Sequence, residues 1–230
     1  MENETTIVYY TDGSVEDSLA ELVRNRLQRT GLPIVSVSQQ PLDFGENFCI
    51  GEIGRSYENI QSQILVGLFM AKTKYVALCE HDTLYPDGYF DFIPPRDDVF
   101  YYNQNRIFVI AKKGPQYGTY ITYKDTKSNV DQLICNRQLM KSATQIRRDL
   151  LVRCRIKDLP SGWDSPGWSF PHETLSWRKT DLPSIDILHN ANFTVRQGTY
   201  RTDDLSTFAK GWGTWSDILE KERNDISTKV

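Results

Sequence analysis

Two acidic residues stand one residue apart at the end of a short apolar segment, in Glu80-His81-Asp82. The segment 75–79 reads Tyr-Val-Ala-Leu-Cys, which is typical of a buried strand. Ligands of open α/β sheets bind at the carboxyl ends of strands, so we expect these carboxylates at a binding edge. Carboxylates fixed there suit Mg²⁺ or Mn²⁺, which keep positions for water and substrate phosphates. Acids also occur at strand ends without binding anything, so the pair alone leaves a solvated role open.

The elements around this pair predict how it is positioned. Apolar runs with turn signals predict strands at 6–10, 33–37 and 75–79. Apolar residues recur at helical spacing after Ser14 and after Ser56, and residues 39–55 read as a glycine-containing loop. This alternation predicts an α/β fold with a mostly parallel central sheet flanked by helices. After Pro86 we expect shorter, mixed strands at 99–102, 106–110, 119–123, 130–136 and 185–188, with helices at 137–152 and 204–222.

The overall composition is that of an ordinary globular protein, with 39% hydrophobic and 25% charged residues in 230. We see no internal repeat or linker, so we expect a single domain over 1–230. No apolar run has the length of a membrane span, and the polar start at residues 1–4 does not resemble a signal peptide, so we expect a cytoplasmic protein, in the host cytoplasm if it is viral. The four cysteines lack Cys-x-x-Cys spacing, which favours reduced thiols over zinc or disulfides.

Four segments, taken in order, resemble nucleotide-sugar glycosyltransferases of the GT-A type. They are Tyr10-Thr11-Asp12-Gly13 after the first strand, Gly54–Ile60 at a helix start, Glu80-His81-Asp82 in the place of the family's Asp-x-Asp motif, and His189 after a late strand. The resemblance covers residues 5 to about 95 in layout, and the second half only through the late histidine and the general plan. It implies a GT-A-like, Rossmann-like fold, with a nucleotide-sugar and metal half at 1–95 and a smaller, mixed-strand acceptor half at 96–230.

The resemblance also implies a metal site and a reaction. The enzyme would move a sugar from a nucleotide-sugar, a UDP-sugar on this resemblance, to an acceptor hydroxyl with Mn²⁺ or Mg²⁺. Asp82 would bind the metal directly and His189 would add a contact from the far end of the sheet. Glu80, longer by one methylene than the family's aspartate, would bind the metal, the ribose or a metal-bound water. We expect His81 to be a filler that points to the other face of the strand.

The donor itself would be held by residues of the first two segments. Arg55 is the candidate for the diphosphate, because guanidinium binds phosphate oxygens in bidentate fashion. Ser56 and the helix amides behind it would add donors. Tyr10, Thr11 and Asp12 lie where the family contacts the nucleobase and ribose. An ordinary surface ion pair for Arg55 and an ordinary strand-to-turn junction at 10–12 are the alternatives.

An inverting transferase also needs a general base near the acceptor hydroxyl. Two acids in an aromatic, turn-rich loop are available, Glu173 and Asp164, with a slight preference for Glu173. A retaining mechanism would make this assignment unnecessary, and the sequence does not decide between the two mechanisms.

The acceptor is suggested by charge. Residues 137–157 carry seven basic residues and one acid, a local charge of +6 in a chain whose net charge is −3. We expect Leu139, Ile146 and Leu150 to face the core, and the basic side chains to face outward, with Arg147, Arg148, Arg153 and Arg155 as nucleic-acid contacts. A basic helix next to a tryptophan-rich loop could bind DNA, and the chain is in this respect similar to phage glycosyltransferases that modify hydroxymethylpyrimidines in DNA. A solvated helix face with a glycan, another small molecule or a protein as acceptor is the alternative.

Two other classes of protein remain open. A nucleotidyltransferase would share the sheet and the acidic metal site, but it would usually carry a glycine-rich, basic loop after the first strand, where residues 12–17 are acidic instead. A non-catalytic nucleotide-sugar-binding module would keep the pocket without metal-dependent turnover.

Overall fold

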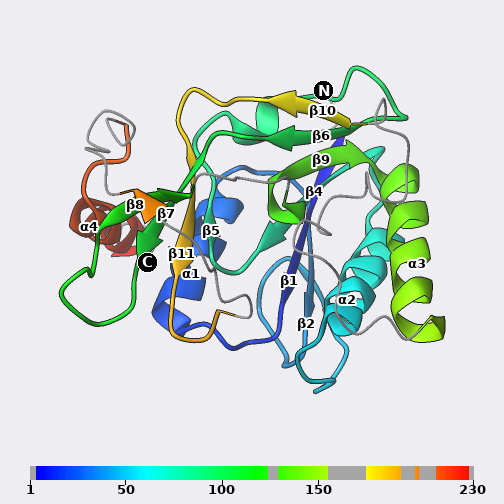
Figure 1. Ribbon diagram of the computed structural model, residues 1–230, viewed down its shortest axis with the longest axis horizontal. Coiled ribbons are helices and arrows are strands. Elements are labelled where there is room, and N and C mark those ends of the chain that lie inside the picture. The colour runs from blue at the N-terminus through cyan, green and yellow to red at the C-terminus, as the bar shows by residue number, and fades with distance from the viewer. Residues whose placement is uncertain (1–3, 124–128, 155–174, 193–199, 202–210, 228–230) are drawn as a thin grey trace.

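The computed structural model describes residues 4–123, 129–154, 175–192, 200–201 and 211–227. Its centre is a seven-stranded sheet in the order β10-β6-β9-β4-β1-β2-β3 (Figure 1). The strands are β1 (Thr5–Thr11), β2 (Ile34–Ser38), β3 (Glu46–Cys49), β4 (Tyr75–Glu80), β6 (Phe100–Asn103), β9 (Leu133–Asn136) and β10 (Leu175–Arg178). Only β9 runs against its neighbours β4 and β6; the other pairings are parallel. The expected mostly parallel central sheet is therefore confirmed.

A second sheet has five strands in the order β12-β8-β7-β11-β5. They are β5 (Thr83–Leu84), β7 (Arg106–Ile110), β8 (Tyr120–Tyr123), β11 (Ser184–Leu188) and β12 (Tyr200–Arg201). Strand β11 runs parallel to β7 and antiparallel to β5, which pairs Asp186 with Thr83. Because β5 begins directly after Asp82, this pairing brings the end of β4 close to the end of β11.

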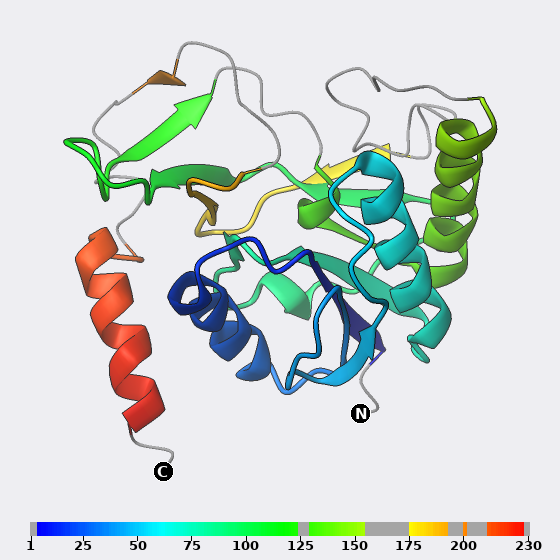
Figure 2. The same cartoon turned by 90° about the horizontal axis from the view of Figure 1, so that it is seen from below.

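Helices cover both faces of the central sheet. They are α1 (Asp17–Gln28), α2 (Tyr57–Met70), α3 (Arg137–Arg153) and α4 (Trp215–Ser227), with short 3₁₀ turns η1 (Tyr89–Asp91) and η2 (Val130–Gln132). Helices α2 and α3 lie side by side on one face, and α1 and α4 lie on the other side of the molecule (Figure 2). Alternate residues of β1 divide between these layers: Val8 and Tyr10 pack towards α2, and Ile7 and Tyr9 pack towards α1.

Gly67 sets the distance between α2 and the sheet. A Cβ at this position would collide with Cγ1 of Val8 on β1 and would meet Cγ2 of Val37 on β2 at 3.4 Å. The absence of a side chain therefore lets α2 approach the sheet closely. This matters for the site, because the N-terminus of α2 carries the segment around Arg55.

Several details differ from the expectations. The segment expected as a loop at 39–55 contains the edge strand β3, and the short strands β5, β10 and β12 were not expected. The C-terminal helix begins at Trp215 rather than near residue 204. These four strands are short, and each is stabilised by pairing with one neighbouring strand, which a local pattern does not reveal.

In the part of the chain that the structure describes, no helix combines the length and apolar character needed to cross a bilayer.

Candidate active site

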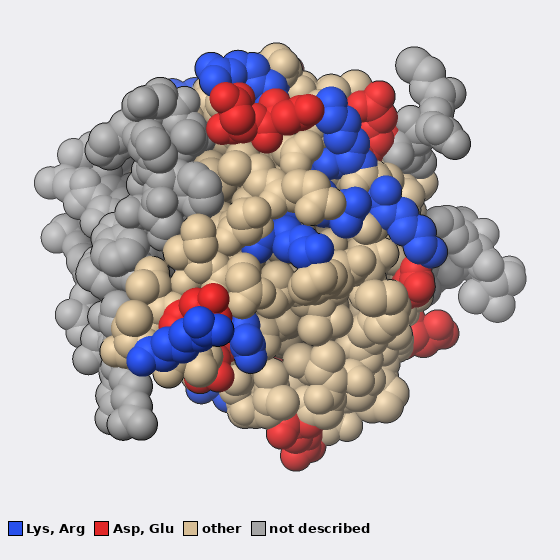
Figure 3. Space-filling view, turned by 90° about the vertical axis from the view of Figure 1, so that its right-hand side faces the viewer, with Lys and Arg blue, Asp and Glu red and all other residues tan. Residues whose placement is uncertain are grey.

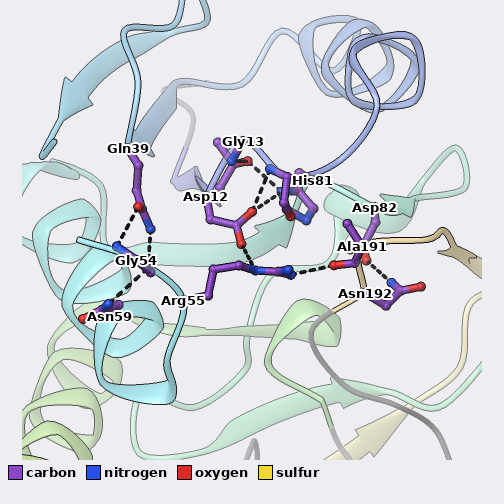
Figure 4. A network of polar contacts seen from close by, with 12 residues as sticks. Asp12, Gly13, Gln39, Gly54, Arg55, Asn59, His81, Asp82, Ala191 and Asn192 are labelled. Atoms are coloured by element: carbon purple, nitrogen blue, oxygen red, sulfur yellow. Dashed lines mark hydrogen bonds and ion pairs between the residues drawn. The ribbon is translucent and has the colours of Figure 1, made fainter. Parts of the chain in front are cut away.

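Three chain segments meet at the carboxyl ends of the strands. Strands β1 and β4 are neighbours, with Tyr10 beside Glu80 in register, so Asp12 and Asp82 both follow at the same edge. The turn after β11 reaches the same place, because the amide of Ile187 donates to the carbonyl of Asp82 at 2.7 Å. Figure 4 shows the resulting network of Asp12, Arg55, His81, Asp82 and the turn at 191–192. Residues up to 180 positions apart are thus brought to one sheet edge.

His81, Asp82 and His189 form a group that could hold a metal ion, since one ligand atom from each lies within 4.8 Å of the others. Nε2 of His189 is 3.4 Å from Oδ2 of Asp82, and the two imidazole rings have centroids 5.9 Å apart. His189 is only 4% exposed, and its Nε2 has no hydrogen-bond partner among the described residues. A buried nitrogen that lacks a hydrogen bond beside a carboxylate fits a cation site. Imidazole and carboxylate together suit a first-row transition ion.

The ring of His189 is held by its own turn. The amide of Ala191 donates to Nδ1 at 3.2 Å, so a neutral ring carries its proton on Nε2, facing Asp82. A cation at Nε2 requires that proton to leave, and a ring protonated at Nδ1 instead no longer accepts from Ala191. The turn after β11 therefore has to adjust if a cation binds to this nitrogen.

The expectation that His81 points to the other face of the strand was wrong, because its side chain lies in this group. Its Nδ1 lies 2.6 Å from Oγ1 of Thr11 and 3.8 Å from Oδ1 of Asp12. Burial lowers the pKa of His81 and outweighs the opposing effect of the charges on Asp82 and Asp12, which favours a neutral ring able to act as a ligand. The alternation of side chains applies within a strand, and β4 ends at Glu80, one residue before His81.

Glu80 lies outside this three-residue group. Its Oε1 accepts a hydrogen bond from the hydroxyl of Tyr10 at 2.6 Å, across the register pair of β4 and β1. The sequence suggested Glu80 as a metal ligand. In the structure His81, not Glu80, lies beside Asp82 and His189 in this group.

Asp12 and Arg55 form the second half of the network. Oδ2 of Asp12 is 2.5 Å from Nε of Arg55, while Oδ1 accepts from the amide of Ser14 at 3.0 Å. Burial raises the pKa of Asp12, but the hydrogen bonds from Ser14 and the charges of His81 and Arg55 together hold it below the usual value. Nη2 of Arg55 donates to the carbonyl of Ala191 at 2.6 Å. Arg55 thus bridges the end of β1 and the turn after β11.

Gln39 holds the segment before α2 through hydrogen bonds to its main chain, a role that the sequence did not indicate. Its Oε1 accepts from the amides of Ile53 and Gly54 at 3.1 Å each, and its Nε2 donates to the carbonyl of Gly54 at 2.7 Å. Ser56 caps α2 by accepting from the amide of Asn59 at 3.1 Å, as its sequence position predicted. Gln39 gave no local signal, because its contacts lie 14 and 15 residues further along the chain.

The face of α3 that is buried differs from the expected one. Arg147 is buried, with 1% of its surface exposed, together with Met140, Ala143 and Thr144, whereas Ile146 is 42% exposed. Arg148 donates from Nε to the hydroxyl of Ser62 at 3.1 Å. Only about a quarter of a turn separates the two possible buried stripes, and the packing of α3 against α2 selects the one that includes Arg147.

What remains exposed on this side is mixed in charge. Arg153 reaches solvent and lies 3.7 Å from Asp149. Figure 3 shows Lys and Arg interspersed with Asp, Glu and uncharged surface on this face, rather than one continuous basic patch. Glu173, Asp164 and Arg155 lie outside the described residues, as do Trp163 and Trp168 of the aromatic loop.

No protein-family model and no curated protein sequence matches the chain. Among solved structures, the apo form of the glycosyltransferase GlyE from Streptococcus pneumoniae TIGR4 superposes with a TM-score of 0.50 at 11% identity, covering 96% of this chain and 64% of that one. A glycosyltransferase involved in the glycosylation of the major capsid of PBCV-1 also gives a TM-score of 0.50 at 7% identity, covering 95% of this chain and 98% of that one. The chain has the fold of these glycosyltransferases. It spans less than two thirds of the pneumococcal chain and nearly all of the PBCV-1 enzyme.

Staphylococcus aureus TarS superposes less well, with a TM-score of 0.43 at 12% identity over 80% of this chain and 36% of that one. At these identities the likeness concerns the architecture. The GT-A-like arrangement that the sequence predicted is confirmed, and the reaction has to be inferred from the residues at the sheet edge.

Proposed function

We propose that this protein is a metal-dependent glycosyltransferase that moves a sugar from a nucleotide-sugar, most simply a UDP-sugar, to an acceptor hydroxyl. The observation that carries the proposal is the meeting of Asp82, His81 and His189 with Arg55 and Asp12 at one sheet edge. Side chains that can bind a metal ion lie next to the guanidinium of Arg55, which can bind phosphate. This combination fits a nucleoside diphosphate. The fold shared with two glycosyltransferases makes sugar transfer the simplest reaction for such a site.

The metal site would be held by Asp82 and His189, with His81 next to them. A bound Mn²⁺ or Mg²⁺ supplies Lewis-acid stabilisation of the charge that develops on the leaving diphosphate. The nitrogen donors favour Mn²⁺ over Mg²⁺. Asp82 brings the negative charge that anchors the cation, and burial of His189 excludes water from one side of it.

The donor would extend from the metal towards β1. Arg55 is the phosphate ligand in this proposal, because its guanidinium lies between the Asp12 carboxylate and the turn that carries His189. Asp12, just after the end of β1, would face the nucleobase and ribose. Tyr10 is buried in the layer beneath α2 and would act indirectly, through its hydrogen bond to Glu80. Thr11 would orient His81 rather than contact the donor directly.

For the acceptor, a hydroxymethylpyrimidine in DNA and a glycan or other small hydroxyl compound are the two candidates. Burial of Arg147 removes one of the four expected phosphate contacts. If DNA is the acceptor, replacing Arg148, Arg153 and Arg155 by Glu should flatten the salt dependence of DNA binding. Each phosphate contact that is lost reduces the number of counterions released on binding. Glu173 and Asp164 are the candidates for an acceptor base.

The experiment is a donor screen with the purified chain. Nucleoside diphosphate release and sugar transfer are measured for several nucleotide-sugars with Mn²⁺, with Mg²⁺ and with excess chelator, on hydroxymethylated DNA and on glycans. Asp82→Asn should abolish turnover with an unchanged circular dichroism spectrum, and Asp43→Asn, an exposed aspartate, serves as the matched control. Full activity in chelator would contradict metal dependence. Pyrophosphate release from nucleoside triphosphates would indicate a nucleotidyltransferase, and binding without turnover a non-catalytic module.

A further inference from the structure

Asn192 connects the two metal-ligand segments through a single side chain. Its Oδ1 accepts from the amide of His189 at 2.7 Å, and its Nδ2 donates to Oδ2 of Asp82 at 3.1 Å. Asp82 and Asn192 are 110 positions apart in the chain. The amide therefore ties the turn after β11 to the carboxylate that follows β4.

The orientation of this amide is fixed by its partners. A main-chain N–H can only donate, so the atom of Asn192 that faces His189 has to be the oxygen. The NH₂ group is then the one that faces Asp82, and it can only donate to the carboxylate. The contact with Asp82 is thus a charge-assisted hydrogen bond with one possible polarity.

The same turn is also held from its outer side. Arg55 donates to the carbonyl of Ala191 at 2.6 Å, and the amide of Ala191 donates to Nδ1 of His189 at 3.2 Å. His189, Ala191 and Asn192 thus each make a contact inside the site, while Asn190 of the same turn is exposed. Figure 4 shows Ala191 and Asn192 beside Arg55 and Asp82.

We propose that Asn192 is a positioning residue that sets the orientation of the Asp82 carboxylate towards His189. This inference rests on the proposed function, because it gives Asp82 and His189 a cation to hold. Groups that hydrogen-bond to metal ligands fix the direction of the ligand lone pairs, and losing one typically reduces metal affinity or activity by roughly 10- to 100-fold. Asn192 does this for Asp82 while locking the main chain at His189.

Two substitutions separate this role from simple support of the turn. Asn192→Ala removes both of these hydrogen bonds and also the longer one from Nδ2 to the carbonyl of Ile187 at 3.5 Å. Asn192→Asp has the same shape and keeps an oxygen for the amide of His189, but it can no longer donate to Asp82. Because the added charge attracts cations by itself, turnover rather than affinity is the decisive measurement for Asn192→Asp. Asn190→Ala and Asn190→Asp are matched controls, since Asn190 is exposed on the same turn.

The test uses Mn²⁺ alone as the binding probe, followed by electron paramagnetic resonance of the free ion, and UDP release from a UDP-sugar as turnover. We expect Asn192→Ala to bind Mn²⁺ about 10- to 100-fold more weakly and Asn192→Asp to lose a similar factor in kcat, with both Asn190 variants unchanged. Wild-type Mn²⁺ affinity in Asn192→Ala, or wild-type kcat in Asn192→Asp, would overturn the inference alone. A wild-type protein that binds no Mn²⁺ would overturn the metal site of the proposed function together with it.

Discussion

Nε of Arg55 lies 2.5 Å from Oδ2 of Asp12, and this ion pair joins the entrance of α2 to the end of β1. Both residues were expected to contact the donor, one at the phosphates and the other at the nucleoside. In the free protein they contact each other instead. In the proposed donor complex, a diphosphate that binds the guanidinium of Arg55 would break this ion pair and free the carboxylate of Asp12, so the two proposed donor contacts would be linked.

Arg55→Ala should weaken the binding of UDP by about 1.5–3 kcal/mol, the range for a hydrogen bond to a charged group. The variant loses the phosphate contact and leaves the carboxylate of Asp12 unpaired near the incoming anion. Isothermal titration with UDP measures the change. Arg153→Ala, on the exposed side of α3, is the control. Wild-type affinity in Arg55→Ala would make the Asp12 contact an ordinary surface ion pair.

Arg147 should be important for stability rather than for binding. The side chain of Arg147 lies on the buried face of α3. Arg147→Ala should therefore lower the free energy of unfolding by at least about 2 kcal/mol, as other large-to-small core substitutions do. Arg153→Ala should change it by less than about 0.5 kcal/mol. Urea unfolding followed by circular dichroism compares the two. Equal, small effects would mean that Arg147 is accessible to solvent.

Gly67→Ala should destabilise the protein by about 1–3 kcal/mol, because the new methyl group meets Val8 on β1 and forces α2 away from the sheet. Val8→Ala removes the obstructing methyl groups. The double variant should therefore be less destabilised than the sum of the single variants by at least about 0.5 kcal/mol, measured as a double-mutant cycle in urea. Strict additivity would show that α2 tilts away without touching Val8.

The four cysteines should divide into two reactive and two unreactive thiols. Cys49 and Cys154 are exposed, while Cys79 and Cys135 are buried, and burial raises the pKa of both buried thiols, so that neither forms thiolate near pH 8. Ellman's reagent should therefore label two thiols in the native protein and four in denaturant. Cys49→Ser should reduce the native number to one. Rapid labelling of all four in the native state would contradict this packing.

The sequence by itself determined the elements whose signals are local. The apolar run at 75–79 became β4, Ser56 became the N-cap of α2, and the spacing of Glu80 and Asp82 marked the sheet edge where the site lies. These features depend on neighbours within a few residues, so hydrophobic periodicity and capping chemistry suffice to predict them. His189 directly follows a predicted strand, but its place at the site was implied by the resemblance to GT-A glycosyltransferases rather than by a local pattern.

Tertiary structure decided which of these side chains meet. The grouping of His81 with His189, the bridge from Arg55 to Ala191 and the bond from Asn192 to Asp82 each join residues more than 100 positions apart. The burial of Arg147 instead of Ile146 depends on which stripe of α3 packs against α2, and both stripes have helical spacing in the sequence. Local patterns specify the faces and ends of elements. The pairing of β5 with β11 and the rotation of α3 about its axis instead follow from packing between elements that are distant in the chain. The pairing of β5 with β11 brings Asp82 and His189 together and so completes the site.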